Sequence, residues 1–130
     1  MIILDTDIMI DILRQRLPAI EWLDSLENEE IVLPGFVVME ILQGCSNKLE
    51  QKQIEKKLMI LARLWPSKEI CNEAVNTFAL FHLSHGLGIL DAIIGQTAVA
   101  LDLPLYTFNQ KHYAAIPGIK TVQPYERQKN

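Results

Sequence analysis

Short apolar runs alternate with segments of helical periodicity along the chain, and this alternation restricts the fold more than any other feature. Directly after the apolar run at residues 2–4, apolar side chains at positions 8, 9, 10, 12 and 13 recur with the spacing of one helix face. The strand-like runs are residues 2–4, 30–33, 62–65, 105–107 and 121–122, and the helix-like segments are 7–14, 18–26, 36–42, 49–61, 68–85 and 91–101. Strands separated by helices predict an α/β fold with a short central parallel sheet of four to five strands and helices on both faces.

Length and composition fit a single domain. The chain has 130 residues and a hydrophobic fraction of 49%, enough for one packed core. No apolar run approaches the length of a membrane span, and Asp5, Asp7 and Asp11 stand where a signal peptide would need a basic start. We therefore expect no membrane association and a cytoplasmic protein, in which Cys45 and Cys71 are reduced core thiols.

The net charge of −4 argues at first against a nucleic-acid partner, because phosphate binding normally draws on Lys and Arg. Carboxylates that bind a divalent cation would weaken this argument. The basic residues also cluster, at Arg14 and Arg16 and along a second segment. That segment carries Lys48, Lys52, Lys56 and Lys57. A solvated helix face, with Glu50 and Glu55 as ion-pair partners, explains the second cluster equally well, so charge alone leaves the partner open.

Four polar positions stand beside the predicted strands and helices in a way that indicates one shared site. Asp5 ends the first apolar run, and Asn109 follows the apolar run that contains residues 105–107. Asp91 stands at the head of a helix-like segment, and Glu40 lies within another. The carboxyl ends of parallel strands converge on one crevice, where three carboxylates and an amide would make an all-oxygen site for a hard divalent cation. Such a site is typical of metal-assisted phosphodiester cleavage.

Each position also has a purely structural interpretation. Asp5 and Asp91 could serve as caps of the helices that follow them, and Asn109 could be a turn residue. Glu40 is harder to explain in this way, because its neighbours in the helix are apolar and a buried carboxylate is costly unless it is paired. The structural interpretations are independent of one another, whereas the shared site explains all four positions together.

Three stretches of the sequence resemble the motifs of the PIN-domain ribonucleases, in particular the VapC-type toxins of type II toxin–antitoxin modules. IILDTDIMIDILR at residues 2–14 resembles the first motif, and VVMEILQG at residues 37–44 resembles the second. GILDAIIGQTAVALDLPLYTFNQKHYAAIPGIKTVQP at residues 88–124 resembles the long C-terminal block, including the T-x-(D/N) element. The ordered set spans nearly the whole chain, although residues 48–65 carry no signature. The resemblance implies a single PIN domain over residues 1–130.

The family's site residues carry over position by position. Asp5 and Asp91 would be the principal ligands of Mg²⁺, or of Mn²⁺ in its place, and Glu40 would complete the metal site and hold a metal-bound water. Asn109 occupies the fourth acidic position as a neutral amide, so we expect one firmly held ion. Thr107 would orient a carboxylate or a water through its hydroxyl group.

Resemblance also implies the reaction and the partners. The protein would be a Mg²⁺-dependent endoribonuclease in which a metal-activated water attacks the phosphodiester bond of RNA, leaving 5′-phosphate and 3′-hydroxyl ends. Its relatives are usually homodimers, held by a cognate antitoxin that inserts a segment, often bearing an Arg, into the acidic groove. Apolar candidates for such contacts are Trp22, Leu26, Phe78, Phe81 and Leu83.

Other functions compete with this interpretation. The strongest alternative is a non-catalytic PIN-like domain that binds RNA or protein, an idea that the amide at Asn109 permits. Asp5-Thr6-Asp7 also resembles the start of the haloacid-dehalogenase phosphatases, but the other elements of that family are missing. We interpret His82 and His85 as helix-face residues and His112 as a residue at the rim of the site. Asp7 is expected to belong to the first turn of its helix.

Overall fold

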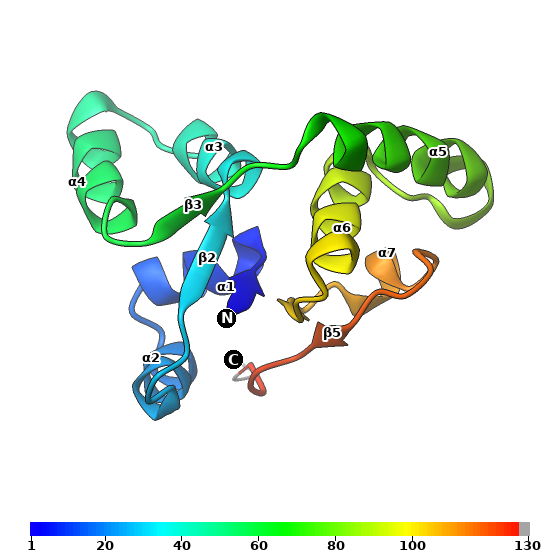
Figure 1. The fold of residues 1–130 in the computed structure, drawn as a ribbon. Coiled ribbons are helices and arrows are strands. Elements are labelled where there is room, and N and C mark those ends of the chain that lie inside the picture. Colours follow the sequence, from blue (N-terminus) through cyan, green and yellow to red (C-terminus); the bar gives the residue numbers. More distant parts are fainter. Residues whose placement is uncertain (128–130) are drawn as a thin grey trace.

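A computed structural model describes residues 1–127 and contains a sheet in the order β3-β2-β1-β4-β5 (Figure 1). The strands are β1 (Ile2–Leu4), β2 (Ile31–Pro34), β3 (Ala62–Leu64), β4 (Leu105–Tyr106) and β5 (Thr121–Val122). All of the strand pairs are parallel, with Ile3 opposite Val32 of β2 on one side and Leu105 of β4 on the other. The predicted α/β fold with a short parallel sheet is therefore confirmed.

Helices connect the strands and fall into two packed groups. They are α1 (Thr6–Leu13), α2 (Leu17–Ser25), α3 (Gly35–Gln43), α4 (Lys48–Leu58), α5 (Lys68–His85), α6 (Ile89–Leu101) and α7 (Gln110–Tyr113). Helix α1 packs against α2 and α3, and α3 packs against α4, whereas α6 packs against α5 and α7 (Figure 1). From β1, the sheet continues to β2 and β3 on one side and to β4 and β5 on the other. Parallel crossovers are nearly always right-handed, so connections that run in opposite directions place their helices on opposite faces. The two groups of helices therefore cover opposite faces of the sheet.

The central strand β1 is apolar throughout because it is buried on both faces. Ile3 and Leu4 have no exposed surface, and Ile2 is only 2% exposed. In parallel sheets, strands covered on both faces consist of continuous apolar runs, which is the pattern seen here. The site residue Asp5 follows directly at the carboxyl end of this strand.

The structure differs locally from the sequence predictions at the start of α3 and after β4. The predicted strand at residues 30–33 extends to Pro34, which pairs with Leu64, and the helix predicted from residue 36 begins directly afterwards at Gly35. A Cβ atom at Gly35 would lie 2.2 Å from the indole ring of Trp65, so any larger residue at this position would have to displace the indole. The short helix α7 was not predicted, because four residues are too few to show a helical period.

The cysteines and the lysine-rich helix differ in detail from expectation. Cys45 and Cys71 are free, as predicted, but both are half-buried and do not belong to the core. The lysines of α4 are exposed, which fits the solvated-face interpretation. Within residues 1–127, however, Glu50 and Glu55 form no ion pairs with them; they accept hydrogen bonds from Ser46 and Gln51 instead. Over the same residues, no helix is long and apolar enough to span a membrane.

The strand order reverses between β1 and β4, because the chain leaves β1 towards β2 and returns on the other side to β4. In open parallel sheets, the crevice at such a switch point is where ligands bind. The segment after β1 begins α1, and the segment after β4 carries Thr107 and Asn109. The fold therefore brings these two predicted site segments side by side.

Candidate acidic site at the carboxyl ends of β1 and β4

Asp5 is the buried centre of the site, with an exposed fraction of 6%. As the N-cap of α1, it accepts a hydrogen bond at Oδ1 from the backbone N–H of Thr6, at 2.8 Å. Its Oδ2 accepts from the hydroxyl groups of Thr107, at 2.9 Å, and Tyr113, at 3.0 Å. Burial raises the pKa of Asp5, the three hydrogen bonds oppose this shift, and the negative charge of Asp91 adds to it. Capping and participation in a shared site therefore coincide in this residue.

Asp7 links the start of α1 to the segment after β4. Its Oδ2 accepts a hydrogen bond from the backbone N–H of Phe108, at 2.9 Å, and lies 3.5 Å from the hydroxyl of Thr107. Burial raises the pKa of Asp7, and the charge of Asp5 raises it further. Asp7 does belong to the first turn of α1, as expected. It also holds the Thr107 segment against Asp5, which the sequence did not indicate.

Glu40 joins the site through Thr6. The hydroxyl of Thr6 donates to Oε1 of Glu40 at 2.9 Å, although 34 residues separate them. Glu40 is half-buried among its apolar neighbours, and this hydrogen bond offsets part of the cost of burying its carboxylate. Helix α3 buries Val37 and Ile41 and turns Glu40 towards α1.

Asp91 is not a helix cap, because α6 begins earlier and its N-cap is Gly88. Oδ2 of Asp91 lies 3.9 Å from Nδ1 of His112, and the side chain remains partly exposed. The pKa of Asp5 responds to the charge of Asp91, so the two carboxylates interact.

His112 stands at the rim of the site, as expected, because its ring lies next to Asp91. His82 and His85 contact residues of their own helix, Phe78 and Ser84, as expected of helix-face residues.

Asn109 contributes through its backbone. Its N–H donates to the hydroxyl oxygen of Thr107 at 2.9 Å, and its side chain is exposed and does not cap α7. Thr107 is completely buried, and its hydroxyl is satisfied within the site: it accepts a hydrogen bond from Asn109 and donates one to Asp5. The turn interpretation of Asn109 therefore agrees with its backbone contact.

Tyr113 is the principal site residue that the sequence analysis missed. It is buried in α7, and burial followed by the charge of Asp5 raises the pKa of its hydroxyl, which stays protonated as a donor. Gly95 of α6 allows this region to pack closely: a Cβ atom there would lie 2.4 Å from the side chain of Ile116 and 3.2 Å from the Tyr113 ring. The tyrosine follows Asn109 at a spacing of four, which is the only local signal for it.

The acidic site offers a divalent cation a small number of carboxylate ligands. Among residues 1–127, no three His, Cys, Asp or Glu side chains converge closely enough to enclose a metal ion. The three predicted ligands are thus not gathered into one cage. Within the described part of the chain, Asp5 nevertheless receives hydrogen bonds only from uncharged groups, and the like charge of Asp91 lies nearby. Mg²⁺ is commonly held by one or two carboxylates while it keeps several waters, and Asp5 with Asp91 fits an ion of this kind.

Comparison with known proteins assigns the fold to a family. The PIN-domain family model matches residues 2–117, and the chain belongs to this family. Over 122 residues it is 29% identical to a protein named ribonuclease VapC10 from Mycobacterium tuberculosis, a match covering 92% of this chain and 91% of that protein. The expected resemblance to PIN-domain proteins of the VapC type is therefore confirmed.

Solved structures show the same similarity. A toxin–antitoxin complex from Klebsiella pneumoniae contains a chain with a TM-score of 0.77 and 29% identity, matched over 98% of this chain and 100% of that one. VapBC-1 from nontypeable Haemophilus influenzae gives a TM-score of 0.73 and 25% identity, over 94% of this chain and 97% of that one. The similarity thus extends over essentially the whole of each compared chain.

Proposed function

We propose that this protein is a Mg²⁺-dependent endoribonuclease and the toxin of a toxin–antitoxin pair. The observation that carries the proposal is the buried carboxylate of Asp5, placed by a PIN fold at the switch point of the sheet and close to the charge of Asp91. Like charges at this depth are unfavourable unless a cation compensates them. The name of the M. tuberculosis relative, a ribonuclease, supports RNA as the substrate.

Asp5 and Asp91 would hold the ion, Mg²⁺ or Mn²⁺. When bound, it would lower the pKa of a coordinated water and stabilise negative charge on the phosphate and the departing 3′-oxygen. Among residues 1–127, Glu40 accepts a hydrogen bond only at Oε1, from Thr6. Its Oε2 can therefore take the proton of the attacking water. Thr107 and Tyr113 act as positioning residues, because their hydroxyl groups fix Oδ2 of Asp5 and leave the carboxylate one orientation.

The antitoxin would bind an apolar hollow beside α1 and α2. This hollow of about 550 Å³ is lined almost entirely by aliphatic side chains, including Met9, Ile20 and Leu23. The Klebsiella structure is a toxin–antitoxin complex, which supports a protein partner for this chain. An arginine from that partner could then pair with the carboxylates and exclude the metal.

A homodimer would use the outer face of α5. Leu83 is 88% exposed, and Val75 and Leu80 are 64% and 70% exposed on the same helix. Large exposed apolar side chains gathered on one helix favour association. Phe78 and Phe81, the aromatic candidates on the same helix, are half-buried and pack against the core, so Leu83 would carry more of this contact.

The test is cleavage of total cellular RNA by the wild type and Asp5→Asn, each with Mg²⁺ or EDTA. Asp24→Asn is the matched control, because it removes the same charge from an exposed position on α2. We expect cleavage with Mg²⁺ by the wild type and the control, with 5′-phosphate ends, and none in EDTA. Asp5→Asn should lose on the order of 10³-fold in rate, since several kcal/mol of charge stabilisation depend on the ion. RNA binding without cleavage would instead identify a non-catalytic binding domain.

A further inference from the structure

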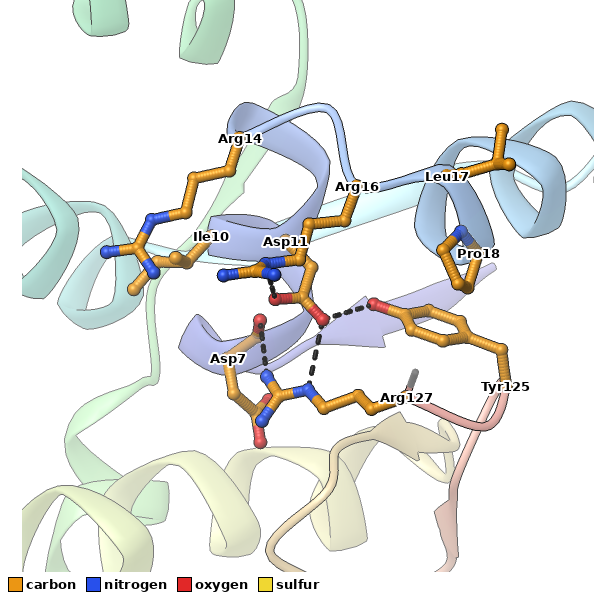
Figure 2. A pocket seen from close by; sticks show the side chains of 9 residues that line it. All are labelled: Asp7, Ile10, Asp11, Arg14, Arg16, Leu17, Pro18, Tyr125 and Arg127. Carbon is orange, nitrogen blue, oxygen red and sulfur yellow. Dashed lines mark hydrogen bonds and ion pairs between the residues drawn. The ribbon is translucent and has the colours of Figure 1, made fainter. Parts of the chain in front are cut away.

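Three of the four arginines in the chain line one hollow beside the acidic site. The hollow has a volume of about 520 Å³ and contains Arg14, Arg16 and Arg127, together with Asp7, Asp11 and Tyr125 (Figure 2). The fourth arginine, Arg63, lies on the edge strand β3. In a chain of net charge −4, this gathering of guanidinium groups is a local reversal of sign.

Asp11 holds two of the arginines in place. Its side chain is 5% exposed, and its Oδ2 lies 3.1 Å from Nε of Arg127 and accepts from the hydroxyl of Tyr125 at 2.9 Å. Nε of Arg16 lies 3.5 Å from Oδ1 of the same carboxylate. Asp11 contacts both arginines through Nε, so their terminal nitrogens can turn towards a second anion. One of these nitrogens, Nη2 of Arg127, donates to the backbone oxygen of Asp7 at 3.4 Å.

Arg14 stands between the hollow and the acidic site. It also lines a second hollow, of about 280 Å³, on the wall of which lies Glu40. Among residues 1–127, no carboxylate forms an ion pair with Arg14, and its side chain is exposed (Figure 2). Positions 7, 11 and 14 share one face of a helix, so this surface runs along α1 from Asp7 to Arg14.

Arg127 connects the hollow to the Thr107 segment. Its guanidinium lies 4.0 Å from the centre of the Phe108 ring, and Phe108 donates its backbone N–H to Asp7. Stacking on the ring and the contacts of Nε and Nη2 hold the guanidinium in place, and among residues 1–127 its Nη1 has no hydrogen-bond partner, so Nη1 can donate to a phosphate oxygen. Three guanidinium groups against the carboxylates of Asp7 and Asp11 leave the hollow with one net positive charge.

We infer that this hollow binds a backbone phosphate of the RNA strand, next to the bond that is cleaved. The inference rests on the proposed ribonuclease function and assigns Arg14 and Arg127 as phosphate-binding residues. The acidic site repels a polyanion, whereas the arginine-lined hollow has a positive balance of charge, and Arg14 links it to the second hollow, whose wall includes Glu40 and Glu50. Since phosphates carry no sequence information, these residues would contribute affinity and register rather than base preference.

The test is the binding of a single-stranded RNA oligonucleotide to the full chain in EDTA, measured by fluorescence anisotropy at several salt concentrations. Arg14→Gln and Arg127→Gln are compared with the wild type, and Arg63→Gln removes the same charge from the opposite part of the sheet. Each lost phosphate contact should lower the slope of log K against log salt by about 0.7 and weaken binding about fivefold at 0.1 M salt. Arg63→Gln should bind as the wild type does. Circular dichroism shows whether Arg127→Gln remains folded, and exposed Arg14 tests the inference independently.

Cleavage with Mg²⁺ separates this inference from the proposed function. If the wild type does not cleave RNA but binds it through Arg14, the ribonuclease proposal fails and the phosphate site stands. If the wild type cleaves RNA and Arg14→Gln binds RNA as tightly as Arg63→Gln, the phosphate site is overturned. Arg14-dependent binding of an oligoglutamate peptide, with RNA binding unaffected, would also overturn it and assign the hollow to an acidic protein segment.

Discussion

The hydroxyl group of Thr107 donates a 2.9 Å hydrogen bond to Oδ2 of Asp5, joining residues separated by 102 positions. These residues follow β4 and β1, the neighbouring strands between which the order of the sheet reverses. Because Thr107 is completely buried, its hydroxyl has no water as an alternative partner. The contact therefore fixes the orientation of the carboxylate on which the proposed chemistry depends.

Replacing Thr107 by valine should lower both stability and activity. Valine keeps the shape but leaves the buried Oδ2 of Asp5 with one donor fewer, at a cost of about 1–3 kcal/mol in the free energy of unfolding. Loss of a residue that orients a metal ligand should slow RNA cleavage about 10–100-fold. Urea denaturation and cleavage rates measure the two effects. Thr107→Ser should restore both, and a valine variant with full activity would show that this hydroxyl orients nothing.

Replacing Tyr113 by phenylalanine should shift the pH dependence of cleavage. The tyrosine hydroxyl donates to the ionised carboxylate and thereby lowers the pKa of Asp5. Its removal raises that pKa, so a higher pH is needed to ionise Asp5. The acid limb of the pH–rate profile should move upward, which kinetic measurements between pH 5 and pH 8 would record. An unchanged profile would mean that ionisation of Asp5 does not limit the reaction.

Replacing Asp5 by asparagine should stabilise the metal-free protein at neutral pH. Burial raises the pKa of Asp5 above its ordinary value of 3.8, so the folded state binds this proton more tightly than the unfolded chain. The wild type therefore gains stability as the pH falls through the folded-state pKa, and the asparagine variant lacks this gain. In EDTA, the variant should be the more stable at pH 7, and the difference should shrink towards pH 4. A variant that is less stable at pH 7 would contradict the burial cost.

Asn109→Ala should have a small effect. The structure engages Asn109 through its backbone N–H, which alanine retains, while the amide side chain is exposed. We expect less than tenfold loss in cleavage rate and a change in stability within about 0.5 kcal/mol, as for ordinary surface substitutions. A much larger loss in rate, at unchanged stability, would place the amide itself in contact with the substrate or the ion.

The sequence predicted the strands and the polar residues at their ends, because a buried parallel strand leaves a continuous apolar run. The apolar residues of α3 also account for the position of Glu40. A helical period buries Val37, Val38 and Ile41 while Met39 is exposed, and a carboxylate at position 40 then lies at the edge of the buried face.

Tyr113 and the arginine hollow could not be predicted in the same way. Tyr113 reaches Asp5 across 108 positions of the chain, and its ring packs against Gly95, so these contacts join distant segments. Arg127 lies 116 positions from Asp11, and their contact depends on the path of the chain after β5. Neither contact produces a pattern in the local sequence, so both could be identified only from the structure.

The central claim, that Asp5 and Asp91 hold a divalent cation, is tested most directly by titration calorimetry of the full chain with Mg²⁺, repeated with Mn²⁺. We predict binding of about one ion by the wild type and by the control Asp24→Asn, as expected of a site with one or two carboxylates. Asp5→Asn and Asp91→Asn should each lose this binding. Undiminished binding by Asp5→Asn, or none by the wild type, would contradict the account.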